Sequence, residues 1–126
     1  MAFHNELGKK GEELAVGLLR SKGYHILDRN WKYGNFEIDI IACTKDQIVF
    51  VEVKTRSDDY WMRPEDAVTL RKQSNTTIAA SHYMQLRHIA LEPRFDVIAI
   101  ILNDHNQEVN HIEDAFVPVI LPRKRR

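Results

Sequence analysis

The chain has 126 residues, 44% hydrophobic and 29% charged, which is typical of one globular domain with one core, and no apolar run approaches the roughly 20 residues of a membrane helix. The formal net charge of zero neither supports nor excludes a nucleic-acid partner. Cys43 is the only cysteine, which excludes an internal disulfide, and the N-terminus lacks a secretion-signal pattern, so we expect a cytoplasmic protein without membrane contact.

The first half of the chain predicts one helix followed by three strands. Leu7, Leu14 and Leu18 recur at helical spacing, which predicts a helix over 7–22. Asn5 is its predicted N-cap, and Gly23 is the residue expected to end it. The strands are predicted over 24–33, 36–42 and 48–55.

The second half predicts a helix followed by two strands. Pro64 is well placed in the first turn of a helix that extends to about Met84. Strands are predicted over 94–102 and 108–112, and the nearly all-apolar run 97–101 indicates burial on both faces of a sheet. The order α-β-β-β-α-β-β predicts a single α/β domain over 1–121. The basic tail 122–126 is either a solvated end or an arm that contacts phosphate.

Charged side chains interrupt two neighbouring apolar strands. Asp39 lies in the strand 36–42, and Glu52 and Lys54 lie in the strand 48–55. Charge in a half-buried strand is costly unless it is paired or binds a metal. If Asp39 lies opposite Glu52, Lys45-Asp46 forms a two-residue hairpin loop, and Glu37 and Lys54 form a cross-strand ion pair.

Two carboxylates that face each other repel unless they share a proton or bind a cation. Carboxylate oxygens suit Mg²⁺ or Mn²⁺, with water and a substrate phosphate completing the octahedron. Lys54 would orient or deprotonate the attacking water, or offset charge in the transition state. The pattern therefore predicts metal-dependent hydrolysis of a phosphodiester. A solvated pair of Glu52 and Lys54 on an exposed sheet face is the alternative.

Glu12 is a further candidate because Gly8 and Gly11 lie beside it on the predicted first helix. Glycine inside a helix costs about 1 kcal/mol relative to alanine, and it is tolerated where a backbone or a ligand approaches closely. Glu12 would then supply a third carboxylate to the metal site. The alternative is a glutamate that faces solvent beside Lys9 and Lys10.

Three residues are candidate nucleic-acid contacts. Arg56 and Trp61 belong to a polar segment with two aromatic residues, a combination that grips a backbone or stacks on bases. Lys72 on the predicted second helix would contact phosphate. The alternatives are a loop packed against the domain and a solvated lysine.

Several strings of this sequence together resemble the YraN-like uncharacterised family. Asp39 followed by Glu52-Val53-Lys54 is similar to the PD-(D/E)xK signature of the restriction-endonuclease-like fold. The resemblance extends from about Asn5 to Ile101. It is carried by Gly8-x-x-Gly11-Glu12, Gly23-Tyr24-x-Ile26-Leu27-x-Arg29-Asn30, Glu37-Ile38-Asp39-Ile40-Ile41-Ala42, Val49-Phe50-Val51-Glu52-Val53-Lys54-Thr55-Arg56, Ala67-Val68 with Lys72, and Arg94-Phe95-Asp96-Val97.

The resemblance implies a mixed sheet flanked by helices, similar to archaeal Holliday-junction resolvases. It implies that Asp39 and Glu52 are metal ligands, that Lys54 is the catalytic lysine, and that Glu12 is the acidic residue on the first helix. A Mg²⁺- or Mn²⁺-dependent nuclease that acts on DNA follows, with branched or junction DNA as one candidate substrate and a homodimer as one arrangement. A catalytically silent nucleic-acid-binding module and an interaction protein with the same fold are the alternatives.

Overall fold

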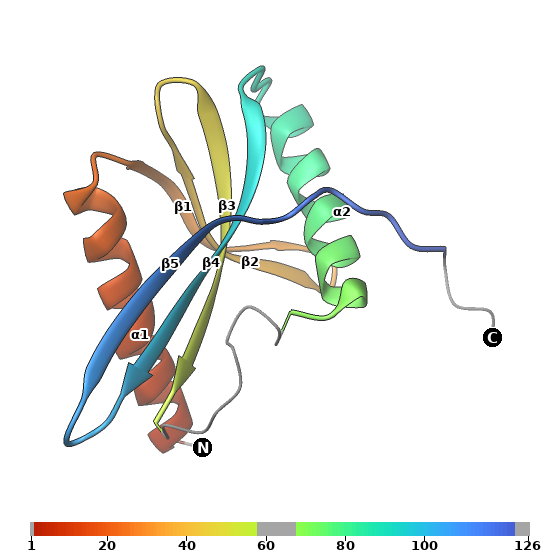
Figure 1. Ribbon diagram of the computed structural model, residues 1–126. Helices are drawn as coiled ribbons and strands as arrows, with labels where there is room; N and C mark the ends of the chain where they lie inside the picture. Colours follow the sequence, from red (N-terminus) through yellow and green to blue (C-terminus); the bar gives the residue numbers. More distant parts are fainter. Residues whose placement is uncertain (1, 58–67, 123–126) are drawn as a thin grey trace.

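The structure is a computed structural model, and it describes residues 2–57 and 68–122 (Figure 1). Within these residues two helices and five strands follow one another, which confirms the predicted order. Their bounds are α1 Ala2–Ser21, β1 His25–Tyr33, β2 Phe36–Cys43, β3 Gln47–Arg56, α2 Leu70–Leu86, β4 Glu92–Leu102 and β5 Gln107–Phe116.

The five strands form one mixed sheet in the order β1-β2-β3-β4-β5. Strands β3 and β4 are parallel, and the other neighbouring pairs are antiparallel. A parallel pair needs a crossover connection, and α2 lies in the segment that joins β3 to β4. Helices α1 and α2 cover opposite faces of this sheet (Figure 1). The predicted α/β class is therefore confirmed.

The core consists of two apolar clusters, one on each face of the sheet. Val16 and Leu19 of α1 pack with strand residues such as Ile98, and Tyr83 of α2 packs with Phe50 and others. Residues 97–100 of β4 are all buried, as the apolar run predicted. Each large side chain that is buried completely stabilises the fold by about 1.5–3 kcal/mol.

The predicted end of α1 is confirmed, whereas its predicted start is wrong. Gly23 has φ of +88°, and the amide of Tyr24 donates to the carbonyl of Leu19 at 3.0 Å. This left-handed cap is the geometry that glycine adopts without a steric penalty. At the other end the helix already begins at Ala2, so Asn5 lies inside α1 and is not its N-cap.

Helix α2 begins later than predicted. Thr69 is its N-cap, and the Thr69 side chain accepts a hydrogen bond from the amide of Lys72 at 3.1 Å. Such a cap satisfies a backbone donor that has no partner within the helix. Pro64, the predicted start, lies outside the described residues.

The register of β2 against β3 is the predicted one. Ile41 pairs with Phe50, and the amide of Thr44 donates to the carbonyl of Gln47 at 2.9 Å across the two-residue loop Lys45-Asp46. The Thr44 side chain also accepts a hydrogen bond from the amide of Gln47 at 3.1 Å. This side-chain contact stabilises a tight turn that contains no glycine.

The pairing of β2 with β3 stops at Ile40 and Val51. Beyond this point residues 36–38 of β2 stay paired with β1, and residues 52–56 of β3 stay paired with β4. The two strands therefore diverge, and β2 leaves β3 toward α2 (Figure 1). We call this divergence, between residues 36–39 and 52–56, the fork. Asp39 and Glu52 are the first residues inside it.

A second polar cluster joins β4 to β5. The Asp96 side chain is fully buried and accepts hydrogen bonds from Arg94 Nε at 2.9 Å, His111 Nε2 at 2.7 Å and the Asp114 amide at 3.0 Å. Burial alone would raise the pKa of Asp96, but these hydrogen bonds lower it below its usual value. Asp96 is therefore a buried carboxylate whose partners lie on the sheet itself.

Neither described helix combines the length and the apolar character needed to cross a membrane. The segment after β5 runs beside α2, where the amide of Leu121 donates to Ser74 Oγ at 2.8 Å and Arg71 Nη2 donates to the carbonyl of Pro122 at 3.2 Å (Figure 1). The rest of the predicted basic tail, 123–126, lies outside the described residues.

Candidate active site

Asp39 occupies the point where β2 and β3 separate. Its Oδ2 accepts a hydrogen bond at 2.8 Å from the amide of Val53, a residue of β3 beyond the last pair of the ladder. A side chain thus satisfies a donor where the neighbouring strand has moved away. This bond holds the Asp39 carboxyl between the two strands.

The structure brings Asp39 together with Glu52, as the register predicted. Burial first, then a hydrogen bond to the Glu52 carboxyl and its negative charge, raise the pKa of Asp39 to about 8. Near neutral pH Asp39 therefore keeps its proton and lies within hydrogen-bonding distance of Glu52. A site in which two carboxyls share a proton can exchange that proton for a cation.

Lys72 of α2 forms an ion pair with this site. Its Nζ lies 3.2 Å from Glu52 Oε1, and the Glu52 side chain is only 12% exposed. Lys72 is in the first turn of α2, at the positive end of the helix dipole, where a cation is unfavourable by about 0.3–1 kcal/mol. The contact with Glu52 offsets this unfavourable position. The sequence predicts a phosphate contact for Lys72, and its pattern gives no sign of the pairing with Glu52.

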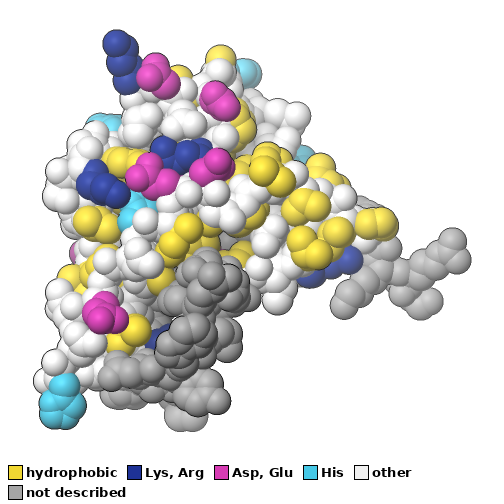
Figure 2. Space-filling model, viewed as in Figure 1, with side chains coloured by type: hydrophobic (Ala, Val, Ile, Leu, Met, Phe, Trp, Pro, Cys, Tyr) yellow, Lys and Arg dark blue, Asp and Glu magenta, His cyan; other side chains and the backbone are white. Residues whose placement is uncertain are grey.

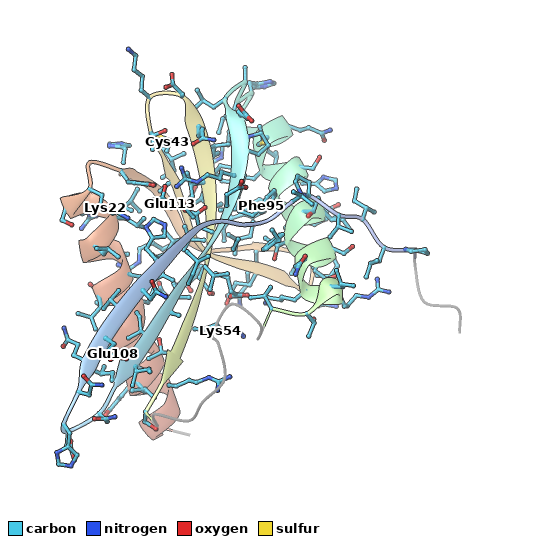
Figure 3. The ribbon with its side chains drawn as sticks, in the orientation of Figure 1. Lys22, Cys43, Lys54, Phe95, Glu108 and Glu113 are labelled. Atoms are coloured by element: carbon cyan, nitrogen blue, oxygen red, sulfur yellow. The ribbon has the colours of Figure 1, made fainter. Side chains whose placement is uncertain are left out.

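A cleft of about 550 Å³ opens beside the carboxyl pair, between α1 and the fork. Lys54 lines it together with Asp39, Glu12 and Glu37. Lys54 is labelled in Figure 3 and has no ion-pair partner within residues 2–57 and 68–122. Lys54 therefore lines the cleft without an ion-pair partner in the described residues, and its role as a catalytic lysine stays a prediction.

The predicted ion pair between Glu37 and Lys54 is wrong. Glu37 instead lies 4.0 Å from Lys32 Nζ, its neighbour on β1. The reason is the fork, because the strands that would bring Glu37 opposite Lys54 no longer pair there.

Glu12 lies in the wall of the same cleft but is held by other partners. Its Oε1 accepts hydrogen bonds from Arg29 Nε at 3.2 Å and from Asn30 Nδ2 at 2.9 Å. Asn30 has φ of +52°, in the left-handed region that asparagine tolerates better than most residues. The sequence pattern does not predict that Arg29 and Asn30 contact Glu12, although both residues belong to the string that carries the resemblance.

The described residues contain no group of three or more His, Cys, Asp or Glu side chains able to hold a metal ion. Asp39 and Glu52 therefore offer two carboxylates, and Glu12 does not complete a three-carboxylate cluster with them. Mg²⁺ in proteins is commonly held by one or two carboxylates, with waters and substrate phosphates as the remaining ligands. The donor set at the fork fits this smaller number.

Gly11 explains how α1 reaches the cleft. A Cβ at Gly11 would lie 1.9 Å from Thr55 Oγ1, so only glycine allows α1 to approach β3 this closely. Gly8 has no heavy atom within 4 Å of such a Cβ and lines the cleft. The close approach predicted for these glycines is confirmed at Gly11.

The other two candidate nucleic-acid contacts are Arg56 and Trp61. Arg56 is the last residue of β3, at the far end of the fork. Trp61 lies outside the described residues. On the face shown in Figure 2, the described Lys and Arg side chains are interspersed with Asp and Glu and form no continuous basic stripe.

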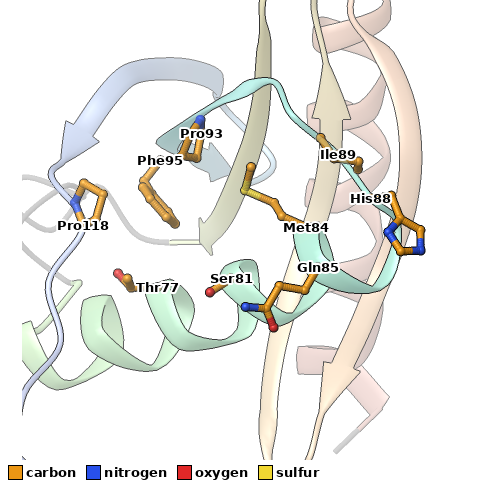
Figure 4. Close-up of a pocket in the computed structure, with 9 residues that line it drawn as sticks. All are labelled: Thr77, Ser81, Met84, Gln85, His88, Ile89, Pro93, Phe95 and Pro118. Atoms are coloured by element: carbon orange, nitrogen blue, oxygen red, sulfur yellow. The ribbon is translucent and has the colours of Figure 1, made fainter.

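A second hollow, of about 610 Å³, lies away from these carboxyls, between α2, the start of β4 and the C-terminal segment (Figure 4). Met84, Ile89 and Phe95 give it an apolar lining, and none of its described lining residues is an Asp, Glu, Lys or Arg. It lacks the charged groups that bind phosphate, so the cleft at the fork is the candidate active site.

Comparison with known proteins identifies the family. The model of the uncharacterised protein family UPF0102 matches residues 11–100, which include α1 from Gly11 on, the fork and most of β4. A UPF0102 protein of Bacteroides thetaiotaomicron is 48% identical over 118 residues, covering 94% of this chain and 98% of that protein.

Similar relatives occur in other bacteria. A UPF0102 protein of Christiangramia forsetii is 47% identical over 92% of this chain and 98% of its own length. One of Porphyromonas gingivalis is 42% identical over 100% of this chain and 94% of its own length. With the family model, these matches show that the chain belongs to the uncharacterised protein family UPF0102.

Proposed function

We propose that this protein is a metal-dependent phosphodiester hydrolase that acts on DNA and has a restriction-endonuclease-like fold. The observation that carries the proposal is the pair of hydrogen-bonded carboxyls of Asp39 and Glu52 at the fork, where Lys54 lines the same cleft as Asp39. Because the two strands separate at the fork, a ligand that enters the cleft can reach the acidic side chain of Asp39.

Asp39 and Glu52 would hold Mg²⁺ or Mn²⁺. The ion would polarise a phosphate oxygen and lower the pKa of a bound water. The fit rests on the chemistry of the donors, since two hydrogen-bonded carboxyls can exchange the proton between them for one small cation. The Val53 amide keeps Asp39 in place, so less side-chain entropy is lost when the ion binds.

The other residues of the cleft have separate proposed roles. Lys54 would orient the attacking water or stabilise the charge that develops on the phosphate. Lys9 and Asn30 also line the cleft and are donors for the nonbridging oxygens of a phosphate backbone. Glu12, oriented by Arg29 and Asn30, would fix the geometry of the α1 wall.

Contacts to phosphate carry no sequence information, so we expect recognition of DNA shape rather than of bases. Branched or junction DNA is the first substrate to test. Cleavage of two symmetric strands would need two copies of the site, which a homodimer would supply.

The direct test is a cleavage assay on branched, duplex and single-stranded DNA with Mg²⁺ or Mn²⁺. We expect the natural protein to cut at least one substrate, and Asp39→Ala and Lys54→Ala each to lower the rate by at least about 100-fold. Lys45→Ala, at the exposed tip of the hairpin, is the control and should retain full activity. Undiminished cleavage in Asp39→Ala or Lys54→Ala contradicts the assigned roles.

One observation favours a second candidate, a DNA-binding module without cleavage. The proton on Asp39 and the Lys72 ammonium reduce the repulsion between the two carboxyls, so no metal is needed to keep them together. Salt-sensitive DNA binding with no cleavage under either metal would select this candidate.

A further inference from the structure

The two lysines near the carboxyl pair have different environments. Lys54 lines the cleft and has no ion-pair partner in the described part of the chain, whereas Lys72 Nζ lies 3.2 Å from Glu52 Oε1. One ammonium is therefore available to a ligand in the cleft. The Lys72 ammonium, in contrast, is already paired with Glu52, a carboxylate that we propose as a metal ligand.

Lys72 reaches Glu52 from the α2 side of the fork. It lines a small hollow of about 100 Å³ with Asn35, Asn75 and others, and Glu37 borders both this hollow and the cleft. The Lys72 side chain is 41% exposed while the Glu52 side chain is 12% exposed. The ammonium can therefore leave Glu52 for solvent without crossing the core.

The position of Lys72 in its helix supports a specific role. The first turn of α2 contains no acidic residue, and an N-terminal turn favours negative rather than positive charge. A basic residue at such a position goes against the local preference, a departure that occurs mainly at functional or strained sites. Glu52 is the one partner in the described structure that explains it.

We propose that Lys72 is a positioning residue that serves as the internal counter-ion of Glu52 and competes with the divalent ion for this carboxylate. The inference rests on the proposed function. When the ion binds, the ammonium is released from Glu52 and becomes available to a phosphate at the edge of the site. Lys72 thus keeps the two-carboxylate site intact before the metal arrives and lowers its affinity for the metal.

A purely structural role gives the opposite expectation. If Lys72 only held Glu52 in place, its removal would disorder the carboxylate and weaken metal binding. Competition predicts tighter binding, because the metal no longer has to displace a bound cation. The sign of the change in metal affinity therefore separates the two roles.

The test is calorimetry of Mn²⁺ binding to the full chain and to variants. We expect Lys72→Met, which keeps most of the alkyl chain, to bind Mn²⁺ about three- to tenfold more tightly than the natural protein. Lys72→Arg should bind Mn²⁺ with close to the natural affinity. Lys45→Met removes one positive charge far from the site and should leave the Mn²⁺ affinity unchanged. Equal or weaker binding by Lys72→Met with its fold retained overturns the inference.

A second measurement uses the natural protein, in case Lys72→Met does not fold. The NMR signals of the Lys72 side chain should shift toward those of a free lysine as Mg²⁺ is added. Signals that stay unchanged at saturating Mg²⁺ overturn the inference, as does a natural protein that binds no Mn²⁺. Competition for Mn²⁺ without any DNA cleavage would support the inference and overturn the proposed function, so the two failures are distinguishable.

Discussion

The surroundings of the Asp39 carboxyl favour its protonated form. Burial and the neighbouring Glu52 raise its pKa to about 8, against an ordinary value of 3.8. In the unfolded chain this carboxyl would lose its proton near pH 4. Between these two values the folded protein holds a proton that the unfolded chain does not.

This difference predicts how stability depends on pH. For a carboxyl with a raised pKa, the contribution to stability is largest below about pH 4 and falls as the pH rises toward about 8. Asp39→Asn removes the titration and keeps an acceptor for the Val53 amide. We expect it to be more stable than the natural protein by about 1–3 kcal/mol at pH 8, and by less at pH 5.

Thermal unfolding across this pH range measures the effect. Added Mg²⁺ is the control, because it should raise the melting temperature of the natural protein at pH 8 and leave Asp39→Asn unchanged. A lower melting temperature for Asp39→Asn at pH 8 would show that the carboxyl pair is not destabilising there.

At the scale of elements, the cleft depends on how closely α1 lies against β3. A Cβ at Gly11 would meet Thr55 Oγ1 at 1.9 Å and the Thr55 Cβ at 2.8 Å, and Thr55 belongs to a strand that is paired with β4. The sheet fixes the position of Thr55, so α1 as a whole must shift away from β3 to make room for the added Cβ. That shift would displace Glu12, the next residue, from the cleft.

We therefore expect Gly11→Ala to destabilise the protein by about 1–3 kcal/mol, the usual result of overpacking. Gly17→Ala on the same helix is the matched control, since no heavy atom lies within 4 Å of its added Cβ. It should stabilise by up to about 1 kcal/mol through helix propensity. Urea unfolding compares the two, and equal effects of the two substitutions would contradict the close contact.

Sequence patterns could predict the strands and their register but not the fork. Alternating apolar residues assign Ile40 and Val51 to one face and so fix which residues of β2 and β3 lie opposite each other. The divergence depends on β2 staying with β1 while β3 follows β4, which is a tertiary property. The same limit explains the mistaken partner for Glu37 and the missed contact of Lys72.

The surroundings of Glu12 were equally beyond the reach of sequence patterns. Its partner Asn30 lies in β1 with a left-handed backbone, and β1 contains an irregularity between Ile26 and Asp28. Both features break the simple alternation of side chains along a strand. The order of helices and strands could be predicted without such detail, because it follows from the spacing of apolar residues alone.

At the scale of the whole molecule, the Asp96 cluster joins parts of the chain that are far apart in sequence. Arg94, which donates to Asp96, also donates to Gln47 Oε1 at 2.9 Å at the start of β3. His111 Nδ1 lies 2.8 Å from Lys22 Nζ at the end of α1. Lys22 and its neighbour Glu113 are labelled in Figure 3.

Asp96→Ala should destabilise the protein by about 3–5 kcal/mol, because it takes from the largely buried Arg94 its one fully buried anionic partner among the described residues. Since the pKa of Asp96 is lowered, its contribution is present above the usual carboxyl pKa and is lost as the pH falls through the lowered value. Glu113→Ala removes a half-exposed partner of Arg94 and should cost less than about 1 kcal/mol. Urea unfolding of both variants at pH 7 checks this, and similar losses would contradict a central role for Asp96.

Crystals soaked in Mn²⁺ give the most direct test of the account, through anomalous diffraction. We predict a single strong anomalous peak, from a Mn²⁺ ion bound by the carboxylates of Asp39 and Glu52. This peak should be absent in crystals of Glu52→Gln. A natural protein that shows no peak at the fork under saturating Mn²⁺, with Lys72 still paired to Glu52, would contradict the central claim.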